Sequence, residues 1–121
     1  MSSQEVINRY SHGERDFIGI EVPEGDSFRG VNLSGANFKN SWISILDFRN
    51  AILRGVCFDY TNVKLSDFRH ADLTGASFRG AFLCGAFFKS AKLENVEVKG
   101  ATWYGGQVLD IRELENLMDP K

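Results

Sequence analysis

The chain has 121 residues, 43% of them hydrophobic, and a formal net charge of −2 at pH 7, which are the values of one ordinary globular domain. Two prolines and twelve glycines are too few for a disordered or collagen-like chain. Two cysteines are too few for a disulfide framework and favour a cytoplasmic protein, and the sequence predicts neither a membrane span nor a secretory signal.

The first predicted element is a short helix over residues 3–12. Its apolar residues Val6, Ile7 and Tyr10 fall on one face at helical spacing. We expect residues 1–16 to form an N-terminal helical cap.

A five-residue pattern follows, and it occupies most of the chain. It starts imperfectly at Phe17 and Val22, with one extra residue before Phe28, and then runs without a break through residues 26–105 as sixteen pentads. All sixteen central residues are large and apolar. The residue two positions earlier is Ala in eight pentads, and the residue two positions later is Gly in eight and Asn in three.

Each pentad position has a physical interpretation. Residues two apart in an extended segment point the same way, so the large and the small residue both face inward. Nine of the ten basic residues of this region directly follow the central residue, as expected of an outward position. Gly and Asn tolerate the positive φ of a tight corner. One pentad therefore forms a short side and a corner, and stacked coils pair at about 4.8 Å.

The number of residues per coil follows less directly. Phenylalanine and aliphatic residues alternate at the central position from Phe28 to Leu93, which is compatible with coils of ten or twenty residues. A coil of ten would leave no room for an interior, so twenty is favoured. Each interior ladder then repeats every twenty residues. The fourth ladder holds Ile43, Val63, Leu83 and Trp103.

The last predicted element is a C-terminal helical cap over residues 106–121. Ile111, Leu114, Leu117 and Met118 share one helical face, and Pro120 follows its end.

The run "ADLTG ASFRG AFLCG" resembles the pentapeptide-repeat family, whose consensus is A(D/N)LxX. The resemblance implies an all-β fold, a right-handed quadrilateral (four-sided) parallel β-helix, with twenty residues per coil and about four coils. We expect it to span residues 17–105, between the two helical caps. Five corner residues depart from Gly or Asn. They are Ile45, Tyr60, Leu65, His70 and Ser90.

The sequence predicts no catalytic, cofactor-binding or metal site. A filled interior leaves no cavity for a substrate, and His12 and His70 lie far apart in the chain without a third ligand. Cys57 and Cys84 fall on different sides of the coil and are not expected to bridge. We therefore expect a protein that is not an enzyme.

A ladder of basic residues raises the possibility of nucleic-acid binding, which the charge pattern argues against. Arg49 and Arg69 are each two residues from an aspartate on the same outward side, and the net charge is negative. The gyrase-inhibiting branch of the family is understood to mimic DNA. Residues 26–105 hold ten basic and seven acidic residues, a balance of +3, whereas a DNA mimic must be acidic. A DNA-mimic inhibitor or protector of DNA gyrase is the alternative function.

The fourth side carries large apolar residues at outward positions, where the pattern elsewhere supplies polar ones. We call it the Trp42 face, formed by residues 41–45, 61–65, 81–85 and 101–105. Three interpretations stay open: a partner-binding surface, cover by the chain's own termini, or chance. The favoured function is a rigid scaffold, a monomer or weak dimer, that presents this face to an unidentified protein; relatives in cyanobacteria allow a regulatory role. Its candidate residues are Trp42, Ile45, Leu65, Phe82 and Tyr104.

Overall fold

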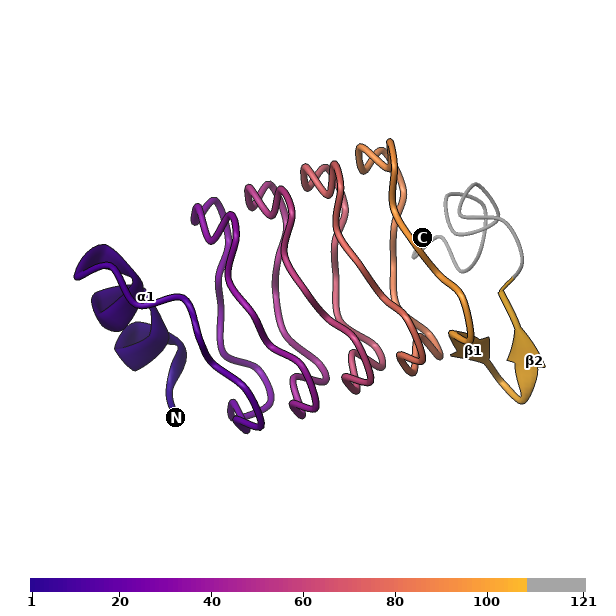
Figure 1. The fold of residues 1–121 in the computed structure, drawn as a ribbon, viewed down its shortest axis with the longest axis horizontal. Coiled ribbons are helices and arrows are strands. Elements are labelled where there is room, and N and C mark those ends of the chain that lie inside the picture. Colours follow the sequence, from indigo (N-terminus) through magenta and orange to yellow (C-terminus); the bar gives the residue numbers. More distant parts are fainter. Residues whose placement is uncertain (109–121) are drawn as a thin grey trace.

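The computed structural model describes residues 1–108, which form a stack of coils (Figure 1). The predicted C-terminal helix falls almost wholly in residues 109–121, outside the described residues. From Ser27 to Thr102, one residue in each pentad makes a parallel bridge to the residue twenty positions later. The two earlier bridges start at Asp16 and Glu21 and span 21 residues, which places the predicted extra residue between Glu21 and Ser27.

Backbone hydrogen bonds between coils hold the stack together. The Phe48 N–H donates to the Asp67 carbonyl at 2.8 Å, and the Asp67 N–H donates to the Leu46 carbonyl at 2.9 Å. The same pattern recurs in successive pentads, so the backbone polar groups of each coil are satisfied by its two neighbours. Twenty residues per coil, the larger of the two predicted values, is the observed repeat.

Each corner is a tight turn. At a regular corner the Ala51 N–H donates to the Phe48 carbonyl at 3.0 Å, and Asn50 between them has a φ of 60°. A type II turn requires positive φ at this position. All sixteen corner residues from Gly30 to Gly105 have positive φ, as the sequence predicts.

The second residue of a pentad stabilises the corner that follows it. Asp67 Oδ1 accepts a hydrogen bond from the Arg69 N–H, and Asn62 Oδ1 accepts one from the Lys64 N–H, both at 3.0 Å. This short-range bond is a preferred one for Asp and Asn, and it explains why the repeat selects these residues here.

The core is a set of stacked side chains inside the coils. Phe48, Phe68 and Phe88 stack with centroid distances of 4.8 and 5.1 Å. A second stack meets the first edge-to-face, with 5.9 Å between the centroids of Phe68 and Phe78. Both arrangements are favourable for aromatic pairs. The small residue of most pentads, such as Ala71, is equally buried and leaves room for the rings.

Two corners depart from the regular turn and recruit a hydroxyl group from the next coil. Ser41 serves the corner between Phe17 and Ile20, and Ser66 serves the corner between Ile43 and Leu46. The Leu46 N–H does not reach the Ile43 carbonyl but donates to Ser66 Oγ, one coil away, at 3.0 Å. The same hydroxyl donates to the Ile43 carbonyl at 2.8 Å. Ser66 is fully buried, so its hydroxyl satisfies two backbone groups that water cannot reach.

A helix, α1 (Ser3–Ser11), lies at one end of the stack (Figure 1). Ser2 caps it by accepting a hydrogen bond from the Glu5 N–H at 3.1 Å. Val6 is buried with the core, and the Tyr10 hydroxyl donates to the Ser34 carbonyl at 2.7 Å. The helix begins at the predicted residue and ends at Ser11, one residue before the predicted end, with His12 as its C-cap.

A hairpin of β1 (Thr102–Trp103) and β2 (Gly106–Gln107) lies at the other end of the stack (Figure 1). Its two-residue loop is Tyr104 and Gly105, with φ of 46° and 85°; positive φ at both is the requirement of a type I′ turn. The pentad pattern predicted a coil through residue 105, but the chain turns back after Trp103. Trp103 packs against the core and stays partly exposed, because it ends the fourth ladder.

Candidate functional site

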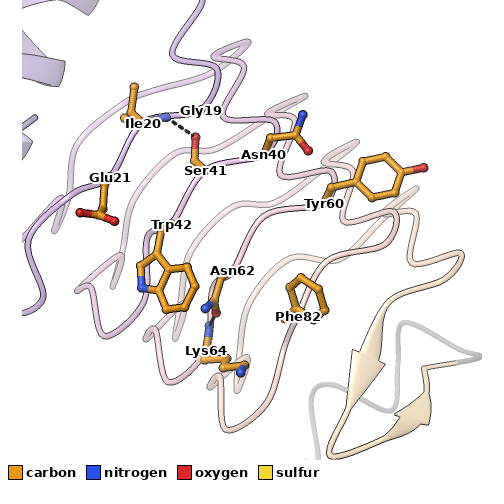
Figure 2. Close-up of a pocket in the computed structure, with 10 residues that line it drawn as sticks. All are labelled: Gly19, Ile20, Glu21, Asn40, Ser41, Trp42, Tyr60, Asn62, Lys64 and Phe82. Atoms are coloured by element: carbon orange, nitrogen blue, oxygen red, sulfur yellow. Dashed lines mark hydrogen bonds between the residues drawn. The ribbon is translucent and has the colours of Figure 1, made fainter.

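Trp42 and Phe82 project from the Trp42 face, two coils apart. Trp42 bridges to Asn62 and Asn62 bridges to Phe82, so the three residues follow one line along the rod. At about 4.8 Å per coil, Trp42 and Phe82 are separated by about 9.6 Å along the axis. Their side chains are 51% and 46% exposed, and Figure 2 shows them on either side of Asn62. The structure therefore brings these two predicted residues together.

Ile45 and Leu65 occupy successive corners of the same face. Their φ values are 55° and 59°, in the left-handed region that disfavours large side chains and β-branched ones most of all. Both side chains remain exposed. Neither local conformation nor burial accounts for the choice of residue at these corners.

Tyr104 extends the apolar surface from the hairpin. Its side chain is exposed, and its N–H donates to Cys84 Sγ at 3.0 Å. A Cβ atom built on Gly85 would lie 3.3 Å from the Tyr104 hydroxyl and would collide with Leu65 Cδ2. Leu65 and Tyr104 thus both lie over Gly85, where a side chain on residue 85 would take up the space that they use.

Tyr60 belongs to the site but was not among the predicted residues. It is 57% exposed and sits at a corner with a φ of 55°. A Cβ atom on Gly80 would lie 2.5 Å from two Tyr60 ring carbons, so the ring covers the next coil at this glycine. Its departure from Gly or Asn at a corner was the available signal. Tyr60 is the last residue of the pentad before residues 61–65, so the division into pentads assigned it to the neighbouring side rather than to the Trp42 face.

Trp42, Tyr60 and Phe82 line an open groove of about 430 Å³. The predicted residues Ile45, Leu65 and Tyr104 are not among the residues that line it. Figure 2 shows Trp42 and Phe82 along its length, Asn62 between them, and Tyr60 and Lys64 at opposite edges. The residues that line it are Gly19, Ile20, Glu21, Asn40, Ser41, Trp42, Tyr60, Asn62, Lys64 and Phe82.

Charged groups surround the groove at its edges. Lys39 Nζ lies 5.9 Å from the Tyr60 ring centroid, and Lys64 Nζ lies 6.0 Å from that of Phe82, both within cation–π range. Glu21 lies exposed beside Trp42. The groove therefore combines an aromatic lining with charges of both signs.

We expect Gly80→Ala to be more destabilising than Gly55→Ala, because the Cβ added at position 80 would displace the Tyr60 ring. Gly55 has the same backbone conformation, φ 65° against 64°, and no atom within 4 Å of a Cβ built on it. The two changes share the strain of positive φ, so urea denaturation should give about 1–2 kcal/mol more for Gly80→Ala. In a Tyr60→Ala background the difference should vanish. A difference that persists there would place the clash elsewhere.

The other candidate residues do not assemble into a site. Within residues 1–108 no group of three or more His, Cys, Asp or Glu could hold a metal ion, and Cys57 and Cys84 are free thiols. No helix in that range has the length and apolar character needed to cross a membrane.

Two residues of the basic ladder, Arg49 and Arg69, are paired with aspartates, as their spacing suggests. Arg49 Nε and Nη2 each donate to an Asp47 carboxylate oxygen at 3.0 Å. This hydrogen bonding lowers the pKa of Asp47 below its usual value. Arg69 makes the equivalent bonds to Asp67, with Nη2 at 2.6 Å. These two positive charges are therefore balanced along their own side.

Comparisons with known proteins agree on one class of fold. A family model described as pentapeptide repeats matches residues 27–69 and 66–102, with 8 copies of the repeat. No curated protein sequence matches the chain. A pentapeptide repeat protein from Nostoc PCC 7120 has a similar structure, with a TM-score of 0.65 and 22% identity over 95% of this chain and 94% of that one.

Two further solved structures are similar to different degrees. Rfr23, a pentapeptide repeat protein from the cyanobacterium Cyanothece 51142, gives a TM-score of 0.56 at 18% identity over 89% of this chain and 100% of that one. QnrB1, a plasmid-mediated fluoroquinolone resistance protein, gives only 0.28 at 12% identity over 71% of each chain. The first shares the fold; the second is too dissimilar to inform the function.

Proposed function

Because the chain belongs to the pentapeptide repeat family, we propose that it is a non-enzymatic rod whose Trp42 face binds another protein. Proteins of this family are generally structural or interaction proteins. One observation carries the proposal: large apolar side chains cluster, half exposed, at outward and corner positions that the repeat elsewhere fills mostly with polar residues or glycine, with Ile52 among the exceptions. The clustered side chains are Trp42, Ile45, Tyr60, Leu65, Phe82 and Tyr104. Such clusters are typical of protein interfaces.

Backbone strain supports the same conclusion. A left-handed conformation costs about 1–2 kcal/mol for a residue with a Cβ, and Ile45, Tyr60 and Leu65 all adopt it. Their exposed side chains recover little of this through burial. Strain that folding does not require is characteristic of functional positions.

The alternative that the chain's own N-terminus covers the Trp42 face has less support than a partner-binding surface. Met1 reaches the edge of the face beside Trp42, and its amino group donates to the Glu21 carbonyl at 2.9 Å. Half of the Trp42 side chain nevertheless stays exposed. The gyrase-directed alternative has less support, since the repeat region 26–105 carries a balance of +3.

The proposal extends to the finer architecture and setting of the protein. We propose a right-handed, four-sided coil over residues 17–105, with residues 1–16 and 106–121 as caps. The burial of Val6 against the core supports the first cap. The free thiols of Cys57 and Cys84 support a reducing, cytoplasmic location. We further propose a monomer or weak dimer with no nucleic-acid, membrane or cofactor partner.

We expect the double variant Trp42→Ser with Phe82→Ser to lose its protein partner and keep its melting temperature. Aromatic anchors often dominate the free energy of an interface, and both side chains are half exposed in the free protein. The measurement is affinity capture from a lysate of the source organism, with thermal denaturation of each variant alongside. Ile52→Ser is the matched control, since Ile52 is 40% exposed at the same pentad position on another side.

Two results would count against the proposal. A double variant that still captures every partner would show that the face is not an interface. A clear fall in melting temperature, absent from Ile52→Ser, would show that the face is covered by the chain itself.

A further inference from the structure

The groove has a repeat length along the rod that matches one type of ligand backbone. Trp42 and Phe82 are two coils apart, about 9.6 Å along the axis. A polyproline II helix has three residues per turn and a rise of about 3.1 Å, hence a turn of about 9.3 Å. Residues three apart in such a ligand would therefore meet Trp42 and Phe82 in turn.

The groove also offers a hydrogen-bond donor midway between these aromatic residues. Asn62 Oδ1 accepts from the Lys64 N–H, and an N–H can only donate, so the amide orientation is fixed and Nδ2 is the remaining donor group. Among the described residues no acceptor pairs with Nδ2. Polyproline II segments expose backbone carbonyls without internal partners, and these are suitable acceptors.

The charges at the groove give the ligand a direction. Glu21 and Glu24 lie beside Trp42, and the Met1 amino group, which donates to the Glu21 backbone carbonyl, adds one positive charge to their two negative ones. Lys64 lies beside Phe82, and Lys39 lies beside Tyr60 at the edge of the groove. A basic residue is therefore favoured at the Trp42 end of the ligand and disfavoured at the Phe82 end.

We propose that the partner segment bound by the Trp42 face is an extended, proline-rich peptide in the polyproline II conformation, with prolines three residues apart on Trp42 and Phe82 and a basic residue beyond Trp42. This inference rests on the proposed function and names the chemistry of its partner. Aromatic-lined grooves are a known means of recognising such segments.

Other occupants fit the groove less well. An added β-strand needs a free sheet edge, but the backbone groups of Trp42 and Asn62 already pair with neighbouring coils. A helix bonds its own carbonyls and has no use for the Asn62 donor. A second copy of this chain contains only Pro23 and Pro120, which are far apart in the sequence. A neutral glycan gains nothing from charges of opposite sign at the two ends.

The experiment titrates three probes into the full-length protein by calorimetry: a deca-proline peptide with a terminal arginine, a Gly-Ser peptide of equal length with the same arginine, and cellohexaose. We expect the deca-proline peptide to bind with a Kd below about 1 mM and the other two not to bind. Phe82→Ser should weaken binding at least ten-fold, and Ile52→Ser should leave it unchanged. Replacing the peptide arginine by glutamate should weaken binding several-fold.

Asn62→Asp isolates the donor, because aspartate keeps the turn-stabilising acceptor, as Asp47, Asp67 and Asp72 do, but lacks the amide N–H. It is measured with an uncharged, capped deca-proline, so that the added charge does not act on arginine. We expect at least ten-fold weaker binding at an unchanged melting temperature.

Three results would overturn the inference: no binding of deca-proline, equal binding of the Gly-Ser peptide or cellohexaose, or deca-proline binding that Phe82→Ser and Asn62→Asp leave intact. The proposed function fails separately. If deca-proline does not bind but the Trp42→Ser, Phe82→Ser variant loses its captured partner, the face is an interface for a partner of other chemistry. If capture also survives, both proposals are wrong.

Discussion

Phe68→Ala is expected to lower the free energy of unfolding by about 3–5 kcal/mol, the largest loss among single substitutions considered for this protein. The side chain is fully buried, and its ring contacts four others, stacking on Phe48 and Phe88 and meeting Phe58 and Phe78 edge-to-face. Truncation removes these contacts and leaves a cavity between coils whose backbones are tied together by hydrogen bonds. Such a site cannot collapse to fill the space.

The matched comparison is Arg29→Ala, one position after a central residue, where the side chain is exposed. It should change the free energy of unfolding by less than about 0.5 kcal/mol. Urea denaturation of both variants measures the contrast. Equal losses would mean that the inward and outward positions of the pentad have been assigned wrongly.

Ser66→Ala is expected to lower the free energy of unfolding by about 2–3 kcal/mol, although alanine is the commonest residue at this pentad position. Removing the hydroxyl leaves the Leu46 N–H and the Ile43 carbonyl without their partner in a buried corner. Each unsatisfied buried group costs about 1–3 kcal/mol, and partial closure of the corner offsets some of the total.

Thr61→Val is the control, because Thr61 is equally buried at the equivalent position of the preceding pentad. Its hydroxyl donates to the Phe38 carbonyl at 2.7 Å, but that carbonyl also accepts from the Ser41 N–H at 3.1 Å. No backbone group is orphaned, so the loss should be near ~1 kcal/mol. A Ser66→Ala variant no less stable than Thr61→Val would show that the corner closes on its own.

The sequence predicted most of the fold because a five-residue period reports directly on which side chains face inward. The positive φ at the corners, the buried centres and the extra residue before Phe28 all follow from that local pattern, and the structure shows each of them. The hairpin was missed because "ATWYG" continues the pattern without a break. The choice between a further coil and a type I′ turn at Tyr104 and Gly105 depends on whether another coil follows to pair with this one, and the five-residue period does not determine that.

The candidate site was predicted in part for a related reason. Trp42 and Phe82 share a pentad position and differ by forty residues, so a twenty-residue coil was enough to place them together. Tyr60 lies at the corner before this side, and its ring turns toward the groove because Gly80 leaves space in the next coil. That contact depends on the absence of a side chain at Gly80, twenty residues away. Glycine is the commonest corner residue, so nothing in the sequence at Gly80 indicates the contact.

The hydrogen bonds between coils also fix the spacing of outward side chains along the axis of the stack. Side chains at one pentad position on one side are separated by a whole number of coil spacings. Because the backbone of each coil is hydrogen-bonded to its neighbours, these distances stay the same when a side chain is substituted. Recognition on such a surface is therefore altered by substitution at preset intervals rather than by remodelling loops. An insertion of twenty residues would add one coil to the stack and keep every side aligned. An insertion of five residues between Trp42 and Phe82 would move all downstream side chains to the neighbouring side and separate the two aromatic residues. Large apolar residues would still face inward, but the phenylalanine stacks of the core would be interrupted.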